Sequence, residues 1–193
     1  YKINFVDIEK QSSAMSINQI KNKINNKSCA ILLTNMFNSI EHSREIKKIC
    51  LTNNITLIED NAIYFDNFNK NIKNNPSYSG SIGDVSISSF GMMKNLSGLY
   101  GGSISTDSDE LNKFALNMIS NFNKFPLVLY TKQIIIFFIL KFFSNKFLYN
   151  YFFFRIIKQS YFGKNILLNL FYPSLKFKIK SDIPKYYFCK VPK

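Results

Sequence analysis

The sequence has few of the residues that build metal centres and histidine-dependent active sites. Its 193 residues include three cysteines and one histidine. The cysteines, Cys29, Cys50 and Cys189, lie far apart, and no Cys-x-x-Cys pair or Cys/His cluster occurs, so no zinc or other metal site is expected. Cys29 and Cys50 stand in apolar runs, which predicts unreactive core thiols in the reducing cytoplasm. His42 stands in a polar context where a helix is expected to begin, which favours a surface residue over a catalytic one.

Acidic residues are scarce in only one part of the chain. Residues 1–123 carry 12 basic and 11 acidic side chains, whereas residues 124–193 carry 13 basic and one acidic side chain. Thirteen of the 20 phenylalanines also lie in the second range. No apolar run there reaches the roughly 18–20 residues that span a bilayer. We therefore expect a near-neutral first part and a basic, aromatic second part.

Residues 1–123 alternate between short apolar runs and stretches with helical spacing. We expect strands at residues 3–6, 30–33, 55–58, 85–90 and 103–106, and helices at 17–24, 41–53 and 107–123. Ser16 is the expected N-cap of the first helix, and Thr106 or Asp107 that of the third. Asp109 and Glu110 would then lie in a first turn, where the helix dipole favours acids. This order predicts an α/β fold with mostly parallel strands.

Two strand ends carry chemically useful side chains. Asp60 falls at the carboxyl end of the strand at 55–58, where open α/β sheets place their ligands. Lys94 follows the strand at 85–90 in a loop rich in Gly, Asn and Ser, and Ser89 precedes this lysine by five residues. Pyridoxal phosphate requires such groups: an amine for a Schiff base, a carboxylate against its pyridinium nitrogen, and donors for its phosphate.

The motifs around these residues occur in a specific order. They are Glu59-Asp60 with Ala62, Gly83-Asp84, Ser89-Phe90, Lys94-Asn95-Leu96 and Gly101-Gly102. Each alone is nonspecific, since a strand-end Asp is commonly a turn residue and a loop Lys is commonly solvated. As an ordered set they resemble the DegT/DnrJ/StrS family of sugar aminotransferases, which are fold-type I enzymes that use pyridoxal phosphate.

The resemblance assigns roles to the matched residues. It implies that Lys94 forms a Schiff base with the cofactor and moves protons, that Asp60 pairs with the pyridinium nitrogen, and that Ser89 donates to the phosphate. Ile63 stands where the family commonly has Gln or His packed on the cofactor ring, and its apolar side chain can still cover the ring face. The Gly101-Gly102 pair is expected to permit a tight turn into the next strand.

The resemblance also implies a fold and a reaction. Residues 1–123 would be part of a fold-type I large domain, with a mixed, mostly parallel sheet between helices, in a homodimer of longer chains. The reaction would transfer an amino group, from glutamate as donor, to a keto group of a nucleotide-linked sugar for a surface polysaccharide or glycoside. A sugar dehydratase of the same fold is one alternative, but that branch replaces the Schiff-base lysine with His, and here Lys94 is present. The other alternative is a catalytically decayed, membrane-associated relative.

Residues 124–180 form the second predicted region, a helical, hydrophobic and basic insertion. Lysine or arginine recurs among apolar residues at positions 132, 141, 146, 155, 158 and 164. This pattern is typical of helices in the headgroup plane, which predicts contact of residues 126–164 with the inner face of the cytoplasmic membrane. Packing on the enzyme core or in an oligomer interface is an equal alternative. Nucleic-acid binding is disfavoured, because long Ile, Leu and Phe clusters would face water. Residues 181–193 are expected to lead back to a small domain.

Overall fold

The computed structural model describes residues 2–10, 12–36, 40–63, 65, 79–92, 94–155 and 189–190. The chain divides into two units, residues 1–120 and residues 121–193. The elements of the first unit are α1 (Ile17–Lys23), β1 (Ala30–Thr34), α2 (Ile40–Asn53), β2 (Thr56–Asn61), β3 (Val85–Ser89), β4 (Gly102–Thr106) and α3 (Asp109–Ser120).

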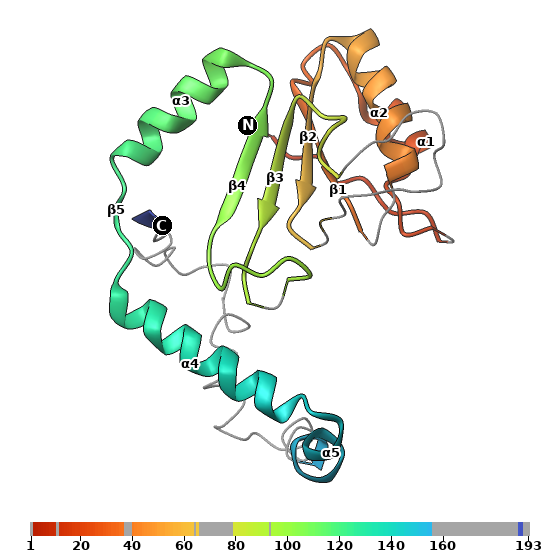
Figure 1. Ribbon diagram of the computed structural model, residues 1–193. Coiled ribbons are helices and arrows are strands. Elements are labelled where there is room, and N and C mark those ends of the chain that lie inside the picture. The colour runs from red at the N-terminus through yellow and green to blue at the C-terminus, as the bar shows by residue number, and fades with distance from the viewer. Residues whose placement is uncertain are drawn as a thin grey trace. The chain divides into compact units, whose positions relative to one another are not determined.

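The first unit is built on a four-stranded sheet in the order β1-β2-β3-β4 (Figure 1). The pairs β1–β2 and β2–β3 are parallel, whereas β4 runs antiparallel to β3. The register places Thr34 beside Asp60, and Asp60 beside Ile87. Because parallel strands end at the same edge of a sheet, Asp60 and the loop after β3 lie at one edge. The predicted α/β class with a mostly parallel sheet is confirmed.

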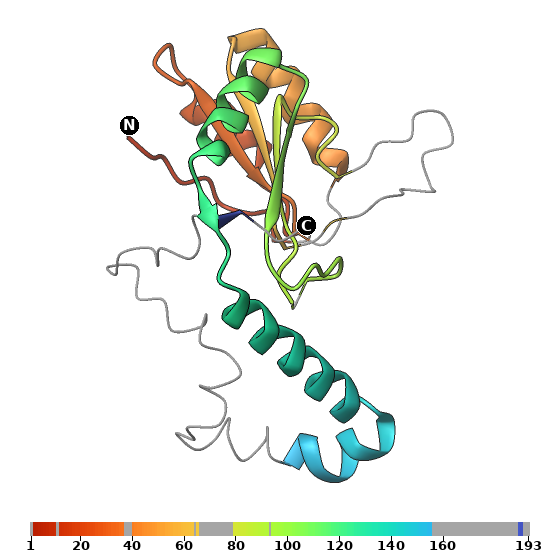
Figure 2. The same cartoon turned by 60° about the vertical axis from the view of Figure 1, so that its left-hand side comes forward.

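Helices α1 and α2 cover one face of this sheet, and Figure 2 shows α2 to one side of the strands. The buried apolar cluster consists of Ile17, Ile20, Leu33, Ile46, Cys50, Ile55 and Leu57. Ile46 and Cys50 lie one turn apart on α2, so both face the same side and are fully buried. Burying a side chain of the size of Ile46 stabilises the fold by about 1.5–3 kcal/mol. This cluster therefore fixes the sheet against the two helices.

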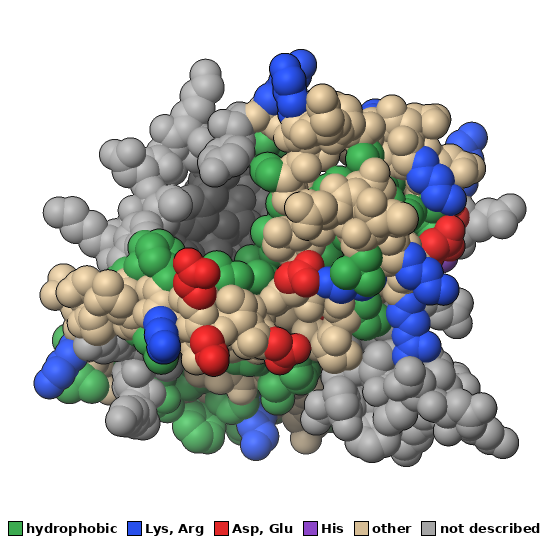
Figure 3. All heavy atoms as spheres, turned by 90° about the horizontal axis from the view of Figure 1, so that it is seen from above, with side chains coloured by type: hydrophobic (Ala, Val, Ile, Leu, Met, Phe, Trp, Pro, Cys, Tyr) green, Lys and Arg blue, Asp and Glu red, His purple; other side chains and the backbone are tan. Residues whose placement is uncertain are grey.

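The opposite face of the sheet, here called the open face, carries exposed side chains in the part of the chain that the structure describes. Leu32, Ile87 and Ile104 point to this side and are 54%, 39% and 58% exposed. The register and the two-residue period of a strand place Asp60 and Ser89 on the same face. Apolar side chains of α3 are also exposed, and Figure 3 shows hydrophobic and acidic side chains side by side at the surface. Asp60 and Ser89 therefore lie on the exposed face of the sheet.

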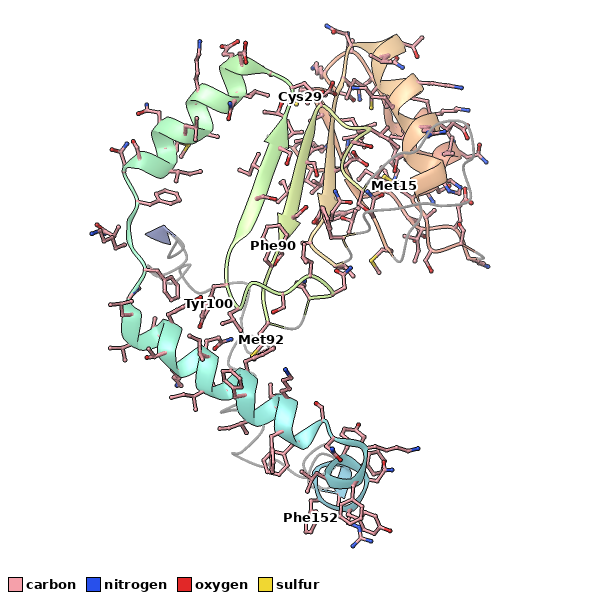
Figure 4. The ribbon with its side chains drawn as sticks, in the orientation of Figure 1. Met15, Cys29, Phe90, Met92, Tyr100 and Phe152 are labelled. Carbon is pink, nitrogen blue, oxygen red and sulfur yellow. The ribbon has the colours of Figure 1, made fainter. Side chains whose placement is uncertain are left out.

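Two predictions about the residues before β1 were wrong. Residues 3–6 form no strand, and the structure shows in this part of the chain a bridge between Ile8 and Met15. Cys29 is exposed, because it precedes β1 at the end of the sheet away from Asp60, as its label in Figure 4 shows. Cys50 is buried as predicted, and burial raises the pKa of its thiol.

The N-cap predicted for the third helix was also wrong. Helix α3 begins at Asp109, and the hydroxyl of Ser108 accepts the N–H of Leu111 at 3.3 Å, which is the bond expected of a capping residue. The hydroxyl of Thr106 instead donates to the carbonyl of Asp84 at 2.8 Å and so joins β4 to the start of β3. The position predicted for Ser16 is correct, although its side chain makes no capping bond.

The second unit contains β5 (Asn123–Lys124), α4 (Leu127–Phe143), α5 (Lys146–Leu148), the π-helical turn η1 (Tyr149–Phe153) and β6 (Cys189–Lys190). β5 and β6 pair in parallel. Among the described residues no single helix combines the length and hydropathy of a membrane span, and α4 with Lys146–Phe152 reaches both only as a pair bent by 81°. Of residues 181–193, which are predicted to lead back to a small domain, the structure describes only residues 189–190.

Candidate cofactor site

The carboxylate of Asp60 is oriented by two donors at the end of β2. Its Oδ1 accepts the N–H of Ala62 at 2.9 Å, the turn-forming bond that Asp commonly makes two residues on. Its Oδ2 accepts the hydroxyl of Thr34 from the neighbouring strand β1 at 3.4 Å. A carboxylate has about four lone-pair sites, so these bonds leave acceptor capacity for a donor above the open face.

The hydroxyl of Ser89 and the side chain of Lys94 converge on one turn after β3. The N–H of Lys94 donates to the carbonyl of Gly91 at 2.9 Å and closes this turn. A Cβ on Gly91 would lie 3.9 Å from both Ser89 Oγ and Lys94 Cγ. Within the described residues neither the Ser89 hydroxyl nor the Lys94 amine has a hydrogen-bond or ion-pair partner. An amine that is free of an ion pair is available for covalent chemistry.

Asn95 attaches the lysine loop to the segment that follows β2. Its side chain donates to the carbonyl of Phe65 and accepts the N–H of the same residue at 3.1 Å. The rings of Phe65 and Phe90 meet edge to face, with centroids 6.3 Å apart, and Figure 4 shows Phe90 near the end of β3. The sequence assigned Asn95 no role, and these contacts show that it holds the loop of Lys94 beside the strand end of Asp60.

The glycine pair predicted to permit a turn has that role. Gly101 adopts φ +100°, which side chains disfavour. A Cβ on Gly102 would lie 2.5 Å from the carbonyl oxygen of Ser88, so only glycine lets β4 approach β3 there. The N–H of Phe90 donates to the carbonyl of Gly101 at 2.9 Å. The turn thereby returns the chain to the sheet directly after the lysine loop.

The positions of Ile63 and His42 do not assign either residue a specific chemical role. Ile63 follows the end of β2 and is 41% exposed, so its side chain is accessible at the same edge of the sheet. Its packing on a cofactor ring stays a prediction. His42 is on α2, with Nε2 3.8 Å from a carboxylate oxygen of Glu9. This position is consistent with the surface role that the sequence favoured.

Asp84 belongs to the fold and not to the candidate site. Burial raises the pKa of Asp84. Hydrogen bonds from the ammonium of Lys47 and the N–H of Leu57, together with the charge of Lys47, lower this pKa by more than burial raises it, so the net pKa is below the ordinary value. The bond from Leu57 N is 2.8 Å long. Since Lys47 is on α2, the pair ties this helix to the start of β3.

A family model described as the DegT/DnrJ/EryC1/StrS aminotransferase family matches residues 1–124. The chain belongs to this family. Membership confirms the resemblance on which the site residues were chosen, the fold-type I class, and pyridoxal phosphate as the cofactor of the family. A search of curated proteins gave no match.

Solved structures share the fold over part of their length. GDP-4-keto-6-deoxymannose-3-dehydratase (ColD) with bound GDP-perosamine is 26% identical, with a TM-score of 0.51 over 62% of this chain and 30% of that chain. The E coli GDP-4-keto-6-deoxy-D-mannose-3-dehydratase with bound hydrated PLP is also 26% identical, with a TM-score of 0.51 over 62% and 29%. The aminotransferase TlmJ from Streptoalloteichus hindustanus is 22% identical, with a TM-score of 0.51 over 60% and 30%. The chain thus spans about three-tenths of the length of these structures.

Proposed function

We propose that the protein containing this chain is a pyridoxal-phosphate-dependent aminotransferase that acts on a keto group of a nucleotide-linked sugar. The observation that carries the proposal is the convergence of the Ser89 hydroxyl and the Lys94 side chain on one turn. This turn follows β3 at the sheet edge where Asp60 presents its carboxylate on the open face. The donor we propose is glutamate, the product enters a surface polysaccharide or glycoside, and the enzyme is a homodimer.

The residues present fit the cofactor. Pyridoxal phosphate, when bound, supplies an electron sink for the amino-group transfer. Asp60 would accept from its ring nitrogen and keep that nitrogen protonated, because a nearby carboxylate favours the positive form. Ser89 would donate its hydroxyl to the phosphate. Lys94 would bind the cofactor covalently and then, as a free amine, move a proton at the substrate carbon.

Lys94 also separates an aminotransferase from a dehydratase. Two of the structural neighbours named above are sugar 3-dehydratases, and one of them was solved with bound GDP-perosamine. That ligand supports a nucleotide-linked sugar as the substrate class here. The dehydratase branch has His at the lysine position, whereas this chain has an amine that can be covalently attached. We therefore favour amino transfer over dehydration.

The test uses the full-length protein with added cofactor. Borohydride reduction followed by peptide mass spectrometry should locate the cofactor on Lys94, and Lys94→Ala should abolish both the attachment and the associated absorbance band. The matched control is Lys113→Ala, an exposed lysine of α3, which should leave both unchanged. Labelling of a different lysine would overturn the assignment. Turnover of a keto sugar without any amino donor would favour dehydration.

We propose further that α4 and the turns after it contact the inner face of the cytoplasmic membrane. Val128, Ile135 and Phe142 are 78%, 59% and 65% exposed. They are spaced seven residues apart, which places them on one face of the helix. Tyr151 and Phe152 are exposed as well, at 58% and 56%. An apolar stripe of this length in water favours a partner that covers it.

The charges of this region favour anionic lipid as that partner. No acidic residue occurs between Glu110 and Asp182. The described part of the second unit contains Lys124 just before α4, Lys132 and Lys141 on α4, and Lys146 and Arg155 after it. Each cation near an anionic leaflet contributes about 1 kcal/mol. Exposed aromatic and aliphatic side chains together with several cations suit a peripheral attachment to the headgroup region.

Vesicle sedimentation of the full-length protein tests this proposal. We expect binding to vesicles with phosphatidylglycerol, weaker binding at high salt, and none to purely zwitterionic vesicles. The triple variant Val128→Ser, Ile135→Ser, Phe142→Ser should release the protein. The control variant Phe114→Ser changes an exposed residue of α3 and should still bind. If the triple variant keeps its membrane binding but dissociates into monomers, the stripe is an oligomer interface.

A further inference from the structure

We propose that Thr34 and Asn35, at the end of β1, are positioning residues that set the carboxylate of Asp60 from both faces of the sheet. The proposal rests on the proposed function, because the group that Asp60 would accept from is the ring nitrogen of the cofactor. Neither residue belongs to the motifs that led to the site. Among the described residues, their side chains donate to the strand end that carries Asp60, and Asn35 also accepts one bond, from Ser43 on α2.

Asn35 contacts three consecutive residues around Asp60. Its backbone N–H donates to the carbonyl of Asp60 at 2.9 Å. Its side-chain Nδ2 donates to Glu59 Oε1 at 3.2 Å and to Asn61 Oδ1 at 2.8 Å. Its Oδ1 accepts the hydroxyl of Ser43 from α2 at 3.2 Å. Because Asn35 is only 2% exposed and both ends of its amide are used, the orientation of the side chain is fixed.

Glu59 and Asn61, the side chains that Asn35 contacts, also form hydrogen bonds to β3 and to the residues just before it. Glu59 Oε2 accepts the N–H groups of Ile82 and Gly83 at 2.9 and 2.6 Å. The Nδ2 of Asn61 donates to Ser86 Oγ on β3 at 3.0 Å. The strand end is therefore held between β1 and β3 by buried hydrogen bonds. Leaving one such buried group without a partner costs about 1–3 kcal/mol.

Thr34 completes the arrangement on the open face. Successive residues of a strand point to opposite faces, so Thr34 faces the ligand side while the Asn35 amide lies beneath it. The Thr34 hydroxyl reaches Asp60 Oδ2, whereas Asn35 holds the backbone of Asp60 and both of its neighbours. Thr34 thus orients the carboxylate, and Asn35 fixes the point from which that carboxylate projects. Both should affect the protonation of a ring nitrogen in front of Asp60.

The test measures the ring nitrogen directly in the full-length protein loaded with ¹⁵N-labelled pyridoxal phosphate. Asn35→Asp keeps the shape and an acceptor for Ser43 but replaces the donor that faces Glu59 and Asn61 with an acceptor. Thr34→Val keeps the shape of Thr34 and removes the hydroxyl. We expect the ring-nitrogen chemical shift to move towards the unprotonated form in both variants, with cofactor affinity at least about tenfold weaker for Asn35→Asp. Thr34→Ser should restore the wild-type signal.

Ser88→Ala is the matched control, since Ser88 is 5% exposed on the same covered face and makes no hydrogen bond to the described residues through its side chain. If Asn35→Asp lowers thermal stability with and without cofactor alike while the nitrogen signal and affinity stay unchanged, Asn35 is only structural and the proposal is wrong. If Asn35→Asp does not fold, the ring-nitrogen signal of Thr34→Val, which changes a side chain on the open face, tests the proposal instead. A wild-type protein that binds no cofactor would overturn both this proposal and the proposed function. A normal wild-type signal with unchanged variants would overturn this one alone.

Discussion

Glu59 and Asp60 are neighbours with the same charge and opposite surroundings. Glu59 is fully buried on the covered face, and its carboxylate accepts from two backbone N–H groups and from Asn35. Asp60 is partly exposed on the open face and accepts from Ala62 and Thr34. Their side chains point to opposite faces of the sheet only because successive residues of β2 alternate in direction. A carboxylate with its donors inside the protein stabilises the fold, and one that retains acceptor capacity towards an open face is available to a ligand.

The largest effect should come from Asp60 and should concern catalysis. In Asp60→Asn of the full-length protein the amide carries no charge to keep a ring nitrogen protonated, so the proton-transfer steps should slow by about 10²-fold or more. Thermal stability without cofactor should change little. Stopped-flow measurement of the two half-reactions and a thermal melt check this. A near-normal rate would show that Asp60 is only a strand-end turn residue.

Glu59 should show the reverse behaviour. Glu59→Ala leaves the N–H groups of Ile82 and Gly83 and the amide of Asn35 without their acceptor in a buried site. We expect a loss of unfolding free energy on the order of 3 kcal/mol, since each unpaired group costs about 1–3 kcal/mol and water replaces part of the lost bonds. Urea denaturation without cofactor measures it. A loss as small as that of Asp60→Asn would remove the distinction between the two faces.

A pair of isoleucines extends the comparison to apolar side chains. Ile46→Ala, in the buried cluster of the covered face, should cost about 2–4 kcal/mol of unfolding free energy. Ile87→Ala, on the open face and 39% exposed, should cost distinctly less. Equal losses in urea denaturation of the full-length protein would mean that other parts of the protein bury the open face around Ile87 as deeply as α2 buries Ile46.

The smallest effect is expected from Asp84. Because its folded-state pKa is lowered, the pair with Lys47 stabilises the fold above the ordinary Asp value of 3.8, and this contribution is lost as the pH falls through the folded value. The side chain of Asp84 is 42% exposed, so Asp84→Asn should cost only about 1 kcal/mol or less at neutral pH. Melts at pH 7 and at acidic pH, where the difference from wild type should vanish, check the sign. A difference that grows in acid would contradict it.

The sequence by itself determined the family and the sheet class, and it supplied the candidate site residues. Asp60, Ser89 and Lys94 could be proposed because each follows or ends an apolar strand within ordered motifs, and such local patterns need no knowledge of distant contacts. The glycine turn at Gly101 and the buried face of α2 at Ile46 follow from backbone sterics and helical period in the same way.

Only the tertiary structure decided which residues hold the site in place. Thr34 and Asn35 lie just after the strand expected at residues 30–33, and nothing in the sequence indicated that they contact Asp60. The pairing of β1 with β2 places them beside it. Asn95 reaches Phe65, thirty residues away. Local composition also mispredicted Cys29, which is exposed at the end of the sheet. These features depend on strand pairing and on which distant side chains meet, and a hydrogen bond between segments far apart in the chain leaves no periodic signal in either segment.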